Sequence, residues 1–90
     1  MRIEFDPAKD KLNVANHGLS LALAEFLVWE EALVWVDDRF EYDEVRMIAL
    51  APAEDRLYYV AFVDREDIRR PISLRYAERR EVKFYVENYP

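Results

Sequence analysis

The sequence predicts an α+β fold: two N-terminal helices, a mainly antiparallel sheet of three to five strands, and a C-terminal helix. The period of the apolar residues predicts it. They recur at helical spacing before Glu31, alternate as in strands after Ala32, and return to helical spacing from Glu78. Helices segregated against an antiparallel sheet make an α+β arrangement. With 90 residues the chain is long enough for one domain and too short for two, so we expect residues 1–90 to form a single domain.

Capping residues delimit the two N-terminal helices. Asp6-Pro7 is typical of a helix start, because Asp accepts the first free amide hydrogens and Pro fits the first helical position. Gly18 predicts the end of this helix, since glycine readily adopts the left-handed conformation of a helix exit. Ser20 is the next expected cap. A second helix reaching about Glu31 is indicated by apolar residues at helical spacing, namely Leu21, Ala24, Leu27 and Val28.

The sheet is predicted from β-rich runs separated by short turns. The clearest run is 57–63, which is nearly all apolar or aromatic, as expected for a central strand buried on both faces. Shorter runs cover 33–36, 45–50 (ended by Pro52) and 72–76, and alternation at 2–5 indicates a short first strand.

Alternation within the last run separates its side chains into two sets. Ser73 and Arg75 are expected on one face, opposite the apolar set Ile72, Leu74 and Tyr76. The helix predicted from Glu78 onward carries an apolar stripe, made of Val82, Tyr85, Val86 and Tyr89.

Composition and charge exclude several kinds of site and of function. Cysteine is absent and there is one histidine, which excludes disulfides and Cys- or His-based metal clusters, so we expect no cofactor and no metal. We found no targeting segment and no membrane span, so the cytoplasm is the expected location. A net charge of −6 argues against a general nucleic-acid coat protein. The charge is uneven, however: residues 1–45 carry −7 and residues 65–83 carry +3, so any anion site is expected in the C-terminal half.

Arginines are the residues most suited to chemistry here. An arginine holds an oxyanion through two parallel hydrogen bonds and stays charged, so several on one sheet face would form a phosphate site. The alternative is that each is solvated or paired with one of the nineteen acidic residues. His17 is equally open: near neutral pH it can transfer protons, or it can simply complement the negative end of its helix.

Three groups of residues, in order along the chain, resemble the BrnT family of ribonuclease toxins. The first group is Asp6-Pro7-Ala8-Lys9, Asn13 and His17-Gly18. The second is Asp37-Asp38-Arg39 and Glu44-x-Arg46. The third is Arg70, Ile72-Ser73-Leu74-Arg75, Ala77, Arg80-Glu81 and Tyr85. The resemblance covers nearly the whole chain.

The resemblance implies a RelE-like fold and a metal-independent endoribonuclease that inhibits translation and is neutralised by a BrnA-like antitoxin. The catalytic residues it implies are His17, Glu44, Arg46 and Arg75. The substrate-binding residues it implies are Arg70 and Ser73, and Arg65, one of the arginines before the last strand, is a further candidate for binding the substrate. RNA and the antitoxin are the expected partners, with a homodimer or a toxin–antitoxin heterotetramer as the assembly. The alternative is a non-catalytic protein-binding module, or a weakened family member acting in antitoxin-linked autoregulation.

Overall fold

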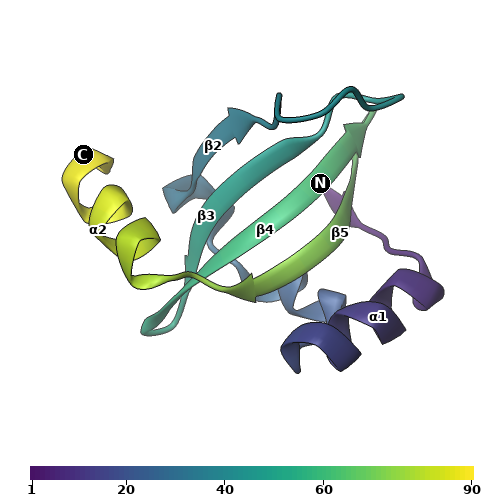
Figure 1. The fold of residues 1–90 in the computed structure, drawn as a ribbon, viewed down its shortest axis with the longest axis horizontal. Coiled ribbons are helices and arrows are strands. Elements are labelled where there is room, and N and C mark those ends of the chain that lie inside the picture. Colours follow the sequence, from purple (N-terminus) through teal and green to yellow (C-terminus); the bar gives the residue numbers. More distant parts are fainter.

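A computed structural model describes all residues, 1–90, and shows a five-stranded mixed sheet flanked by helices (Figure 1). In chain order the elements are β1 (Arg2–Ile3), α1 (Pro7–His17), the 3₁₀ helices η1 (Leu21–Phe26) and η2 (Trp29–Glu31), β2 (Leu33–Val36), β3 (Met47–Ala53), β4 (Arg56–Arg65), β5 (Ile68–Tyr76) and α2 (Arg79–Asn88). The strand order is β1-β5-β4-β3-β2, with β4 central as predicted. Only β1 pairs in parallel, with β5. None of the helices is long and apolar enough to cross a membrane.

The predicted caps of the first helices are confirmed. Asp6 accepts a hydrogen bond from the backbone N–H of Ala8 at 2.9 Å, and Gly18 ends α1 with a φ of 73°. Ser20 caps the next segment by accepting from Ala22.

That next segment differs from the single helix expected up to Glu31, because it forms two 3₁₀ turns. Its buried residues are Leu21, Ala24 and Leu27, which are spaced three apart. A 3₁₀ helix has three residues per turn, so within η1 it places Leu21 and Ala24 directly in line, and Leu27 follows in extended conformation.

The core lies between η1 and one face of the sheet. It contains Leu21, Ala24 and Leu27 together with sheet residues Ala49, Ala51, Ala53, Tyr58, Val60, Phe62 and Leu74. The helix η1 packs mainly on β5 and η2 packs on β3, while the buried Phe62 meets the Trp29 ring edge-on, with the ring centroids 5.3 Å apart.

β3 includes Pro52, which was expected to end the strand. Pro52 pairs with Leu57 on β4, while β2 pairs with β3 only as far as Leu50. On the side of β3 that β2 no longer covers, the carbonyl of Pro52 accepts a hydrogen bond from the backbone N–H of Val28 at 2.8 Å. The N–H that proline lacks would point to this same side, where no neighbouring strand requires it.

The prediction that Ile72 faces the core is wrong, because β5 contains a β-bulge at this residue. The register shifts between Ala61 and Phe62, so Ala61 pairs with Ser73 while Phe62 pairs with Pro71, and Ile72 has no partner. Pro71 therefore takes the core-facing position beside Leu74 that alternation had assigned to Ile72.

The C-terminal helix α2 forms as predicted, but its apolar stripe is not buried. No residue of α2 is buried, and Val86 is 70% exposed. The helix stands beside the β2–β3 side of the sheet (Figure 1). Its contacts with the rest of the chain include a hydrogen bond from the Tyr85 hydroxyl to the Glu31 carbonyl and an edge-on contact between Phe84 and Trp35.

Asn13 joins α1 to the free edge of β5. Asn13 is a buried residue, with 3% of its surface exposed. Its side-chain amide donates to the carbonyls of Leu74 and Leu19, each at 2.8 Å. Its Oδ1 accepts from the backbone N–H of Leu74 at 2.9 Å. Asn13 thus completes the backbone hydrogen bonding of β5 where β1 no longer covers it.

Asn13→Ala is expected to lower the free energy of unfolding by roughly 2–3 kcal/mol, because it leaves backbone groups of Leu74 and Leu19 unpaired beside the core. Urea unfolding followed by tryptophan fluorescence measures this. Asn16→Ala, on an exposed position of the same helix, is the control and should change stability by less than about 0.5 kcal/mol. Equal effects of the two substitutions would contradict the role given to Asn13.

Candidate active site

The predicted residues of β5 lie on the face of the sheet opposite the core, here called the site face. Arg70, Ser73 and Arg75 share this face because their partners on β4 are spaced two residues apart. Those partners are Val63, Ala61 and Tyr59. Arg46 directly precedes β3 and alternates with Met47, which packs against the core, so it points to the site face as well.

At one end of the site face lies a cleft of about 540 Å³, here called the arginine cleft. Its lining residues are Lys9, Glu41, Tyr42, Asp43, Glu44, Arg46, Val63, Arg70 and Ile72. They come from α1, from the β2–β3 loop and from the two strands β4 and β5. The structure therefore brings together three of the residues predicted from the sequence, namely Glu44, Arg46 and Arg70.

The positive charges of the arginine cleft are free to bind an anion. Lys9, Arg46 and Arg70 form no ion pair within 4 Å and no side-chain hydrogen bond. The Nε of Arg46 is buried without a hydrogen-bond partner. Glu44 is paired with Arg65, so the cleft also holds one neutralised carboxylate beside its free cations.

Two further carboxylates, those of Glu41 and Asp43, line the same cleft. They weaken its attraction for a long polyanion. Binding of a phosphate there therefore depends on direct contacts with the unpaired cations, because a charge-assisted hydrogen bond is stronger than a neutral one.

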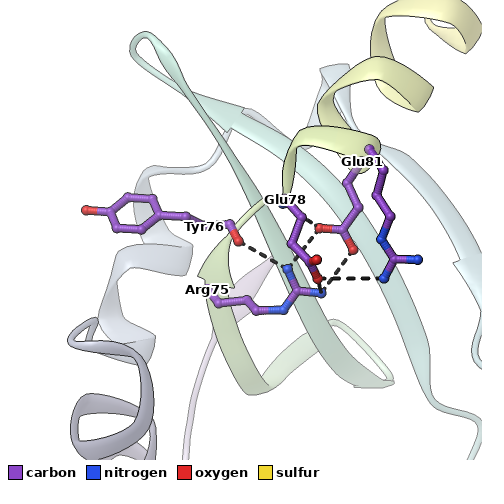
Figure 2. A network of polar contacts seen from close by, with 5 residues as sticks. Arg75, Tyr76, Glu78 and Glu81 are labelled. Carbon is purple, nitrogen blue, oxygen red and sulfur yellow. Dashed lines mark hydrogen bonds and ion pairs between the residues drawn. The ribbon is translucent and has the colours of Figure 1, made fainter.

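Arg75 lies at the far end of the site face, where it is bound by α2 (Figure 2). Its two terminal nitrogens donate to the Glu81 carboxylate at 2.8 and 2.9 Å, and Glu78 lies 3.6 Å away. The guanidinium also stacks on the Tyr59 ring at 3.9 Å. The hydrogen bond to Glu81 raises the pKa of Arg75 further above its usual value. Arg75 thus anchors α2 to the sheet.

The remaining predicted residues lie outside the arginine cleft. Ser73 lies on β5 between Arg70 and Arg75, and Arg65 pairs with Glu44 at the cleft's border. His17 is exposed at the C-terminal end of α1 and makes no side-chain hydrogen bond or ion pair. Since each helical residue adds about 1.5 Å, His17 lies roughly 12 Å from Lys9 along the helix axis.

Sequence reasoning identified three of the nine lining residues, and among those it missed are Lys9 and Tyr42. Lys9 stands in the segment Asp6-Pro7-Ala8-Lys9 that carries part of the family resemblance, and that was the available signal. Tyr42 lies in a loop without periodicity, where only the structure reveals that its ring covers Arg46 at 4.0 Å.

Comparison with known families adds an independent observation. Residues 5–81 match a family model described as ribonuclease toxin, BrnT, of type II toxin–antitoxin system. No curated protein matches the chain significantly. The matched range contains the whole arginine cleft, and it also contains Arg75 with its partner Glu81. No group of three or more His, Cys, Asp or Glu side chains is arranged to hold a metal ion.

Glu81→Gln is expected to make stability less sensitive to acid. Burial alone would raise the pKa of Glu81, but hydrogen bonds from Arg75 and from the backbone N–H of Glu78 lower it below its usual value. Such a carboxylate stabilises the fold above its unfolded pKa, and that contribution is lost as the pH falls through the folded pKa. Between pH 7 and pH 3, urea unfolding should therefore show a smaller loss of free energy for Glu81→Gln than for the parent.

The control for this measurement is Glu87→Gln, on the same helix and without an ion pair. It should retain the acid sensitivity of the parent. A parent-like response of Glu81→Gln would show that the Arg75–Glu81 pair does not stabilise the fold.

Proposed function

Because the chain belongs to the BrnT family of ribonuclease toxins of type II toxin–antitoxin systems, we propose that it is a metal-independent endoribonuclease that holds an RNA phosphate in the arginine cleft. The observation that supports this most directly is that two arginines without an ion pair line one cleft, Arg46 from the end of the β2–β3 loop and Arg70 from β5. Other arginines of the site face, Arg65 and Arg75, are neutralised by carboxylates of the same chain.

In the proposed reaction the ribose 2′-oxygen attacks the adjacent phosphorus and the bond to the 5′-oxygen breaks, leaving a 2′,3′-cyclic phosphate. Arg46 and Arg70 stabilise the negative charge that grows on the phosphate oxygens. Glu44 accepts the 2′-hydroxyl proton, and Lys9 or a water donates a proton to the leaving 5′-oxygen. Glu44 can accept this proton only after its ion pair with Arg65 opens. The released Arg65 guanidinium is then available to the phosphate as a further cation.

His17, Ser73 and Arg75 belong to the proposal as groups that contact RNA beyond the cleft. Ser73 lies next along β5 and can donate to a neighbouring phosphate. Arg75 reaches RNA only when its pair with Glu81 opens. His17 transfers a proton only at a phosphate that lies toward the C-terminal end of α1, since it does not line the cleft.

Inhibition of translation follows from this proposal if messenger RNA is the substrate. The family implies an antitoxin protein as partner, and we propose a BrnA-like antitoxin that carries a DNA-binding domain. Exposed apolar side chains of the edge strand β2 and of α2 suit such a partner, because uncovered apolar surface often marks an interaction site. On β2, Val34 and Val36 lie on the core side of the sheet, and Trp35 on the other face contacts Phe84 of α2. On α2, Val82, Phe84 and Val86 are exposed.

Arg46→Ala and Arg70→Ala are each expected to lower kcat/KM for RNA cleavage by about 10²–10³-fold, because each removes one stabilising donor from the transition state. A short RNA carrying a fluorophore and a quencher measures the rate. With EDTA present the parent rate should persist; loss of cleavage in EDTA would contradict metal independence alone.

The control is Arg79→Ala, at the exposed start of α2 and without an ion pair, which should cleave within about twofold of the parent. Circular dichroism and thermal unfolding confirm that each variant is folded. The cleft assignment is wrong if both cleft variants cleave RNA like the parent, or if Arg79→Ala loses as much activity as they do.

Expression of the chain alone is expected to arrest growth, and co-expression of the antitoxin, sought in the neighbouring gene, should relieve the arrest. Light scattering after size exclusion then gives the stoichiometry, expected to be a toxin–antitoxin heterotetramer. A partner that binds a chain without any cleaving activity would favour the alternative of a non-catalytic binding module. Absence of both binding and arrest would contradict both functions.

A further inference from the structure

One buried carboxylate, that of Asp37, fastens the loop between β2 and β3. Its side chain is 1% exposed and accepts two hydrogen bonds from the Arg39 guanidinium, at 2.7 and 2.9 Å. It also accepts from the Tyr42 hydroxyl at 3.1 Å. These bonds, the Arg39 side chain first, hold the pKa of Asp37 far below its usual range although burial opposes this. Asp37 is therefore ionised at neutral pH and fixes the position of Tyr42.

Tyr42 in turn covers Arg46. The guanidinium carbon of Arg46 lies 4.0 Å from the centre of the Tyr42 ring, close enough for a cation–π contact. The backbone of the same loop is tied at this point, because the N–H of Asp37 donates to the carbonyl of Arg46 at 2.7 Å. The Tyr42 hydroxyl is engaged by Asp37, so it is poorly placed to act as a proton donor to substrate.

This arrangement determines how Arg46 is presented to the cleft. Its Nε is buried and makes no hydrogen bond, while its terminal nitrogens have no partner in the protein. A free arginine side chain samples many rotamers, and ordering it upon binding costs free energy. With the guanidinium held against a fixed ring, that cost is met when the protein folds rather than when it binds.

We propose that Asp37 and Tyr42 are positioning residues that fix the Arg46 guanidinium for binding a phosphate. This inference rests on the proposed function, because Arg46 is the residue that contacts the phosphate there. Asp37 never touches the substrate. It acts through the Tyr42 hydroxyl, and Tyr42 acts through its ring.

The test compares Asp37→Asn and Tyr42→Phe with the control Asp38→Asn. The control removes the same charge from the neighbouring residue, which is exposed and forms no ion pair. Two readouts are needed: the kcat and KM of RNA cleavage, and the ¹⁵N-resolved NMR signal of the Arg46 Nε–H. Circular dichroism establishes that each variant is folded, and Tyr42→Phe, which removes one hydroxyl, keeps the test decisive if Asp37→Asn is unstable.

In the parent and in Asp38→Asn, the Arg46 Hε should be shifted upfield of the other arginines by the Tyr42 ring. In Asp37→Asn and Tyr42→Phe it should move toward the arginine average, and kcat/KM should fall about 10- to 100-fold, as expected when a catalytic group is misplaced by about 1 Å. Unchanged signals overturn the inference, and so does a rate loss without a change in the Arg46 signal. If Arg46→Ala itself cleaves like the parent, the proposed function fails instead, and the NMR comparison still reports whether Arg46 is positioned.

Discussion

The site face depends on the β-bulge at Ile72. In a regular strand Arg70 would point to the opposite side from Ser73 and Arg75, because side chains alternate at every residue. The unpaired Ile72 inserts one extra residue, so Arg70 comes to lie opposite Val63 while Ser73 remains opposite Ala61. Pro71 is suited to the bulge, since it fills the core-facing position and needs no backbone N–H partner. Without the bulge, Arg70 would point into the core beside Phe62, and the arginine cleft would lose one of its two free guanidinium groups.

Local signals predicted much of this fold. Asp6, Gly18 and Ser20 act through their own neighbouring backbone, so their capping roles could be read from the sequence, and the apolar run 57–63 became the central strand. The bulge could not be predicted, because it depends on the register between two strands, which no single strand encodes. The packing of α2 was missed for a similar reason. Its stripe has helical spacing, but spacing does not say whether another surface is present to cover it.

The sequence could not show which arginines are paired with carboxylates and which are free. The sequence contains thirteen basic and nineteen acidic residues, so any arginine had many available partners. The structure separates two groups that look alike in the sequence: Arg65 and Arg75 bind carboxylates, while Arg46 and Arg70 do not. Arg75 stands in the third group of residues that resembles the family, yet its terminal nitrogens are engaged by Glu81. The difference arises from contacts between elements, such as the contact of β5 with the helix α2 that follows it, and alternation and motif spacing do not specify such contacts.

The excess of acidic residues also has a structural explanation that reconciles it with a phosphate-binding cleft. Asp37, Glu44 and Glu81 each bind an arginine of this chain, so these carboxylates order the site rather than merely repel an anion. Glu81 and Asp37 order their arginines in different ways. Glu81 fixes Arg75 by occupying it directly, which leaves it unavailable while the pair persists. Asp37 acts on Arg46 through the ring of Tyr42, which orders the guanidinium but leaves its terminal nitrogens unbonded. An acidic chain can therefore keep an arginine both fixed and free, because the carboxylate that positions it is separated from it by an aromatic ring.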